Sequence, residues 1–132
     1  MIATKLLELA DARTVVEAAQ REAATNGWKI SVSVVDAGGH PLLFERMDGV
    51  APATARIAFE KAQTAAIFKG STAGMEDRIP ERLAMLRLPG ATPLKGGVPL
   101  TSDGQVVGAV GISGLTPQQD QQVAEAAAKA VS

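Results

Sequence analysis

The segment ISVSVVDAGGHPLLFER, residues 30–46, contains the clearest structural signal in this sequence. Its first seven positions place apolar and small side chains in the alternation of period two that a β-strand requires. DAGGH at 36–40 then supplies turn-forming residues, and 41–46 resumes as a second strand. Strands joined by so short a connection pair antiparallel. The sequence therefore predicts a β-hairpin over 30–46.

Amphipathic helices are expected on both sides of this hairpin. Apolar residues recur every three to four positions over 4–26, which predicts a helix that ends at an Asn-Gly pair. A second helix is predicted over 53–69, with a stripe of alanines small enough to lie close to a sheet. Glycine and proline interrupt 70–92, and only a short helix near 80–86 is expected there.

The last third of the chain repeats the hairpin pattern and closes with a helix. A short strand is predicted at 98–100, a turn at SDG (102–104) and a long strand at 105–113. TPQQ at 116–119 has the residues of a helical capping box. These elements predict an α+β fold for a single domain, residues 1–132, with one antiparallel sheet and helices on both of its faces.

Composition excludes several classes of protein. The 132 residues carry a formal net charge of −1, contain no cysteine and include one histidine. Nucleic-acid binding is not expected because that function selects a basic patch. No membrane partner is expected either, since no run approaches the roughly 20 apolar residues of a membrane span. The first residues lack the long apolar stretch of a secretory signal, so a cytoplasmic protein is expected.

Two basic residues are candidates for binding an acidic ligand. Arg46 ends a predicted strand, and Lys61 interrupts a partly apolar stripe of the 53–69 helix. Together they could hold a carboxylate, the arginine through two hydrogen bonds and the lysine as a point charge. The alternative is pairing with the carboxylates nearby in the sequence, Glu45, Asp48 and Glu60.

Small polar residues and glycines complete the candidate ligand-binding set. Thr64 shares the stripe of Lys61, and Gly96-Gly97 could present backbone amides to an anion. Ser113-Gly114 lies just before the last helix, whose N-terminus also attracts anions. Asp120 is interpreted as a complement to the dipole of that helix.

The single histidine, His40, has two interpretations. It could be a metal or haem ligand. Alternatively it is an exposed turn residue that packs on the following proline, since it lies between turn-forming residues.

Several motifs resemble, in order and over nearly the whole chain, those of the GlcG/HbpS family of haem-degrading or haem-binding proteins. They are VVDAGGH (34–40), RMD (46–48), EKAQTAA (60–66), GGVPL (96–100), DGQVVGAVGISG (103–114) and QD (119–120). The resemblance implies a profilin-like fold, a homo-oligomer, haem or another carboxylate-bearing small molecule as ligand, and a gene in a catabolic operon.

Three hypotheses about function follow. The first is a cytoplasmic, oligomeric ligand-binding protein that takes haem or another carboxylate-bearing molecule. The second is a cofactor-free lyase or isomerase that acts on a small hydroxy or aromatic acid, with Lys61 as its base. The third is a sensory module that binds a protein partner through the alanine-rich face of the 53–69 helix. The sequence leaves open whether the protein is an enzyme.

Overall fold

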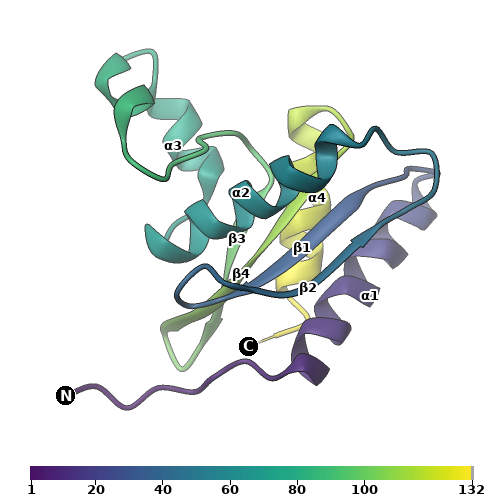
Figure 1. Ribbon diagram of the computed structural model, residues 1–132, viewed down its shortest axis with the longest axis horizontal. Helices are drawn as coiled ribbons and strands as arrows, with labels where there is room; N and C mark the ends of the chain where they lie inside the picture. The colour runs from purple at the N-terminus through teal and green to yellow at the C-terminus, as the bar shows by residue number, and fades with distance from the viewer. Residues whose placement is uncertain (132) are drawn as a thin grey trace.

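The computed structural model describes residues 1–131 and contains a four-stranded sheet in the order β2-β1-β4-β3 (Figure 1). All three pairs of neighbouring strands are antiparallel. The strands are β1 (Ser31–Asp36), β2 (Pro41–Arg46), β3 (Gly97–Ser102) and β4 (Gln105–Ser113). Both predicted hairpins are confirmed, and the third strand is longer than predicted at each end.

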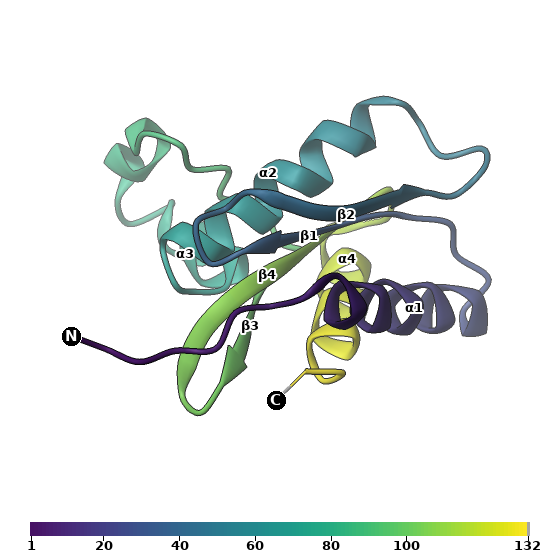
Figure 2. The ribbon, with the colours of Figure 1, turned by 60° about the horizontal axis from the view of Figure 1, so that its bottom comes forward.

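Helices cover both faces of the sheet, which confirms the predicted α+β architecture (Figure 2). The helix α1 (Leu9–Thr25) packs beside α4 (Pro117–Ala128) on one face, and α2 (Ala53–Ile67) lies on the other. The helix α3 (Thr72–Arg78) and a short 3-10 helix, η1 (Leu83–Arg87), follow α2.

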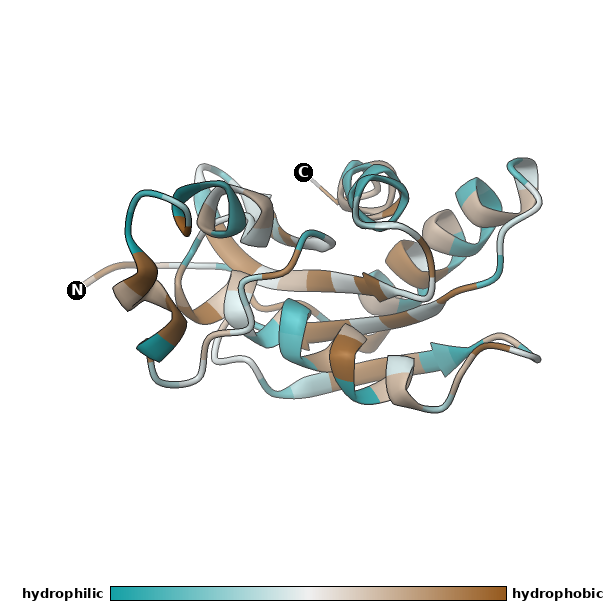
Figure 3. Ribbon diagram, turned by 90° about the horizontal axis from the view of Figure 1, so that it is seen from above, coloured by the Kyte–Doolittle hydropathy of each residue, from teal (hydrophilic) through white to brown (hydrophobic). Residues whose placement is uncertain are grey.

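The two faces of the sheet differ in the size of their side chains. Valine and isoleucine, including Val32, Val110 and Ile112, form the main core with α1 and α4. The opposite face carries small residues such as Ser33 and its cross-strand neighbour Gly111. Figure 3 shows hydrophobic residues alternating with paler ones along the strands. The alternation of period two in the sequence therefore separates a bulky face from a small one.

The small face lets α2 come unusually close to the sheet. A Cβ atom added to Gly111 would overlap the carbonyl oxygen of Ala58 and would lie 2.6 Å from the backbone nitrogen of Ala62. The alanine-rich stripe of α2 (Ala58, Ala62 and Ala65) is fully buried in this contact. That stripe therefore packs within the molecule and is not an available surface for a protein partner.

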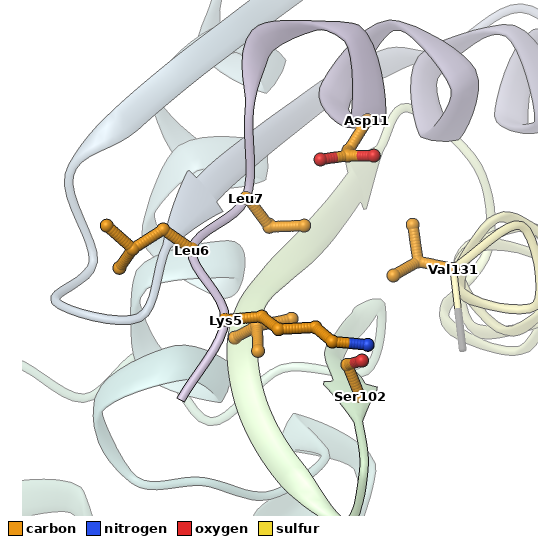
Figure 4. Close-up of a pocket in the computed structure, with 7 residues that line it drawn as sticks. Lys5, Leu6, Leu7, Asp11, Ser102 and Val131 are labelled. Atoms are coloured by element: carbon orange, nitrogen blue, oxygen red, sulfur yellow. The ribbon is translucent and has the colours of Figure 1, made fainter. Parts of the chain in front are cut away.

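The first helix starts later than predicted, at Leu9 instead of residue 4. Glu8 is the N-cap, and its side chain and that of Asp11 form a reciprocal capping box. The preceding Leu7 packs where a Cβ on Gly108 would have to be, and this contact holds the N-terminal segment in an extended path across the sheet. Residues of this segment line a small cavity together with Asp11, Ser102 and Val131 (Figure 4).

The segment 70–92 also differs from its prediction. The short helix expected near 80–86 is present as η1, which begins three residues later, whereas α3 was expected to be loop. The Ser71 side chain accepts a hydrogen bond from the Ala73 amide and so starts α3 despite the glycine at position 74. Pro80 has no amide hydrogen to continue that helix. The glycine was therefore a misleading signal, and the serine cap was the useful one.

Candidate functional site

A buried ion pair joins α2 to α4. The Lys61 Nζ atom lies 3.0 Å from Asp120 Oδ2 and donates a second hydrogen bond, of 2.9 Å, to the carbonyl oxygen of Ile112 in β4. The two side chains are 4% and 5% exposed. The counter-ion of Lys61 is therefore neither a ligand nor one of the carboxylates nearby in the sequence, but a residue 59 positions away.

The environment of Asp120 opposes its ionisation only in part. Burial raises the pKa of this carboxyl above its ordinary value, while the Lys61 ammonium and the Leu115 amide, which donates to Asp120 Oδ1 over 3.1 Å, pull the pKa down. The sequence suggested a dipole role for Asp120. The missed signal was that Lys61, set in an apolar stripe, needs a buried counter-ion.

The predicted glycine pair lies beside this ion pair. Gly96 has a φ of 120°, and a Cβ on it would lie 2.7 Å from the Ile112 oxygen and 3.1 Å from Lys61 Nζ. The Gly96 amide donates to Gln121 Oε1 over 3.0 Å, and the Gly97 amide donates to Thr72 Oγ1 over 2.9 Å. Both amides thus already have partners within the chain, and the glycines serve close packing.

The other predicted ligand-binding residues lie in separate places. Arg46 and Ser113 belong to one cross-strand row, on either side of Ser31, and Gly114 follows with a φ of 123°. Thr64 instead binds the loop before β3, because its hydroxyl accepts a 2.8 Å hydrogen bond from the Thr92 amide. The fold therefore gathers Lys61 with the glycine pair, and places Arg46 and Thr64 elsewhere.

His40 lies at the end of the turn between β1 and β2, which Asp36 organises. One carboxylate oxygen, Asp36 Oδ1, accepts hydrogen bonds from the amides of Gly38 (2.9 Å) and His40 (3.0 Å). The same oxygen is 3.4 Å from His40 Nδ1. The hydrogen bond that the His40 amide donates is the leading reason why the pKa of Asp36 lies below its ordinary value.

The imidazole of His40 is consequently oriented but accessible. Its side chain is 79% exposed, so packing does not enclose it as a core residue. With Nδ1 facing a carboxylate, Nε2 is the ring nitrogen left for a ligand. This is the arrangement of metal-binding histidines, whose second nitrogen is held by a carboxylate or carbonyl. Among residues 1–131, no cluster of three or more acidic or histidine side chains could hold a metal ion by itself.

Most of the chain is similar in sequence to known proteins. Residues 7–129 match the family model for "Haem degrading protein HbpS-like". The chain belongs to this HbpS-like family. It is 48% identical over 103 residues to the protein GlcG of Escherichia coli (strain K12), a match that covers 77% of each chain.

Solved structures of HbpS-like proteins share the fold. A crystal structure of a double mutant of Streptomyces reticuli HbpS superposes with a TM-score of 0.91 at 31% identity, over 100% of this chain and 91% of that one. The structure of PduOC in complex with haem matches with a TM-score of 0.86 at 29% identity and covers 96% of both chains. In the described part of the chain, every helix is too short or too polar to cross a membrane.

Proposed function

We propose that this HbpS-like protein binds haem and that the imidazole of His40 is an axial ligand of the iron. The observation that carries the proposal is the contact between Asp36 and His40, which turns one ring nitrogen toward a carboxylate and leaves the other exposed. Histidine is a common axial ligand in haem proteins. When bound, haem would supply an iron centre whose properties depend on this ligand.

The relatives support the choice of haem over other carboxylate-bearing molecules. PduOC, which matches over 96% of this chain, was crystallised as a haem complex, and the family is described by haem degradation. Arg46 remains a second candidate contact, for a carboxylate of the ligand, because it is exposed at the end of β2 and makes no ion pair within residues 1–131. Lys61 is already neutralised by Asp120.

The experiment is a titration of the purified protein with haemin, followed by the Soret absorbance. We expect a saturable, stoichiometric shift in the wild type, and in His40→Ala a shifted or weaker spectrum because the axial ligand changes. Asn26→Ala, which alters an exposed residue at the end of α1, is the control and should bind as the wild type does. A saturable spectrum that is identical in His40→Ala would remove His40 as ligand, and a wild type without saturation would contradict haem binding.

We also propose that the protein acts as a cytoplasmic homo-oligomer. Support for self-association comes from residues 79–94, the leucine lobe, which projects from the body beyond the end of α2 (Figure 1). Leu83 is 67% exposed and Leu86 is 60% exposed, and such clusters of exposed apolar side chains are typical of protein interfaces.

No reaction is proposed, because Lys61, the candidate base, is enclosed with its counter-ion.

A further inference from the structure

One end of the sheet forms a groove of about 530 Å³. Four segments that are distant in the sequence meet there: the N-terminal segment, the β1–β2 turn, the end of α2 and the β3–β4 hairpin. All four lie toward the same side of Figures 1 and 2. The residues that line this turn-end groove are Ile2, Thr4, Ala37, Ala66, Lys69, Gly104, Gln105 and Val106.

The groove has the size and the lining of a small-molecule site. Ligand pockets typically span about 300–1,000 Å³ and combine apolar walls with a few polar groups. Ile2, Ala66 and Val106 supply apolar walls here, and Gln105 supplies an amide. Lys69 is the only ionisable side chain among the lining residues. A ligand with an apolar body and one anionic group would match this combination.

Lys69 occupies a backbone position that normally belongs to glycine. It follows the C-cap of α2 with a φ of 55°. Its amide donates to the Ala66 oxygen and that of Gly70 donates to the Ala65 oxygen, which is the Schellman arrangement at a helix end. A left-handed conformation is unfavourable for a residue that carries a Cβ atom. The chain thus carries a lysine at this strained position, although a glycine follows it directly.

The charge on Lys69 has no partner within the described chain. Lys69 takes part in none of the ion pairs that residues 1–131 form. The acidic groups near the neighbouring turns are engaged elsewhere, because Asp36 holds the β1–β2 turn and Asp103 pairs with Lys5 over 3.2 Å. An anionic ligand in the turn-end groove could therefore pair with the Lys69 ammonium without displacing a carboxylate of the protein.

We propose that the turn-end groove is the ligand site of this protein and that Lys69 pairs with the anionic group of an apolar ligand. The inference rests on the proposed haem-binding function for the identity of the natural ligand, and it gives that function a location. His40 lies in the same turn as Ala37, which lines the groove. A haem propionate is one anionic group of the required kind.

The test uses 8-anilinonaphthalene-1-sulfonate, a fluorescent probe with an apolar body and a single sulfonate. We expect saturable binding to the wild type, at least about tenfold weaker binding to Lys69→Met, which is the scale of a charged hydrogen bond, and recovery in Lys69→Arg. Val106→Phe should also weaken binding, because it fills the groove. Lys129→Met is the matched control, since Lys129 is likewise an exposed lysine at a helix C-terminus but does not line the groove.

The outcomes separate this inference from the proposed function. Absence of saturable probe binding, equal binding by Lys69→Met, or equal weakening by Lys129→Met would each overturn the groove as the site. Haemin titrations of the same variants then decide the ligand. Haem binding that survives Lys69→Met and Val106→Phe contradicts the groove but keeps the proposed function. Probe binding that depends on Lys69, in a protein that takes up no haemin, supports the groove and contradicts haem.

Discussion

The Lys61–Asp120 pair shows how one residue links three elements of this fold. The lysine of α2 reaches across the sheet to a β4 carbonyl and to the first turn of α4. Charges buried to this extent are stable only when they are paired and hydrogen-bonded. We therefore regard Lys61 as a residue that connects elements, while the possibility that it also contacts a ligand stays a prediction from the sequence.

Replacing Lys61 should destabilise the folded state, because the Asp120 carboxylate would stay buried without a counter-ion. For Lys61→Met we expect a loss of about 3–5 kcal/mol in the free energy of unfolding, the usual result of breaking one half of a buried pair. The double variant Lys61→Met/Asp120→Asn should lose less than the sum of the two single variants. Urea denaturation of all four proteins measures this coupling, and strictly additive losses would contradict it.

The loss of unfolding free energy in Lys61→Met should increase as the pH rises. Burial already raises the pKa of Asp120, and loss of the ammonium raises it further. The folded state then retains a proton that the unfolded state releases near its ordinary value of 3.8. Stability of the variant relative to wild type should therefore fall as the pH rises from below about 4 through the folded pKa. Denaturation curves across this range provide the check.

Asp36 should have the opposite pH dependence. Its pKa is lowered in the folded state, chiefly by the His40 amide. The stabilisation is therefore fully present above the ordinary value of 3.8 and is lost as the pH falls through the folded pKa. The difference in unfolding free energy between wild type and Asp36→Ala should shrink as the pH is lowered from 6 to 3 (a range that brackets that value). A constant difference over that range would contradict the assignment.

At the scale of elements, the close approach of α2 to the sheet decides which glycines are indispensable. A methyl group on Gly111 would overlap the backbone of α2 around Ala58, and backbone cannot rotate away as a side chain can. We expect Gly111→Ala to destabilise the protein by about 1–3 kcal/mol or more, as overpacking does. Thermal or urea denaturation measures the change.

Gly74 offers the matched control for this prediction. It lies inside α3, and an added Cβ would meet no atom within 4 Å. Gly74→Ala should therefore stabilise by about 0.5–1 kcal/mol, the helix preference for alanine over glycine. If the two substitutions had the same effect, the tight contact between α2 and the sheet would not determine the cost at Gly111.

For the whole molecule, the leucine lobe is the surface to which we assign self-association. Leu83→Ser/Leu86→Ser should shift the protein to a smaller species in analytical ultracentrifugation, because it removes exposed apolar side chains without touching the core. Leu6→Ser is the control, since Leu6 is 81% exposed but lies in the N-terminal segment. An unchanged sedimentation profile of the double variant would locate the interface elsewhere, and a wild type that sediments as a monomer would contradict self-association.

Local sequence signals determined most of the secondary structure. Alternation of apolar and small residues predicted β1, turn-forming residues predicted both hairpins, and the threonine cap predicted the start of α4. These predictions held because each signal acts over a few residues. The predicted start of α1 was wrong and α3 was missed, because Leu7 packs against distant Gly108 and the Ser71 cap outweighs Gly74. The short helix expected near 80–86 is present as η1.

The same distinction, between local signals and contacts of distant residues, applies to the candidate site. The residue types at 36–40 predicted that Asp36 and His40 share a turn, because aspartate readily accepts hydrogen bonds from the backbone amides that follow it in the sequence. By contrast, it is the packing of the folded chain that pairs Lys61 with Asp120 and brings Ile2, Ala37, Lys69 and Val106 to one groove. Such contacts depend on the packing of helices on the sheet, because the distances between residues remote in sequence are fixed only when the faces of these elements are buried together.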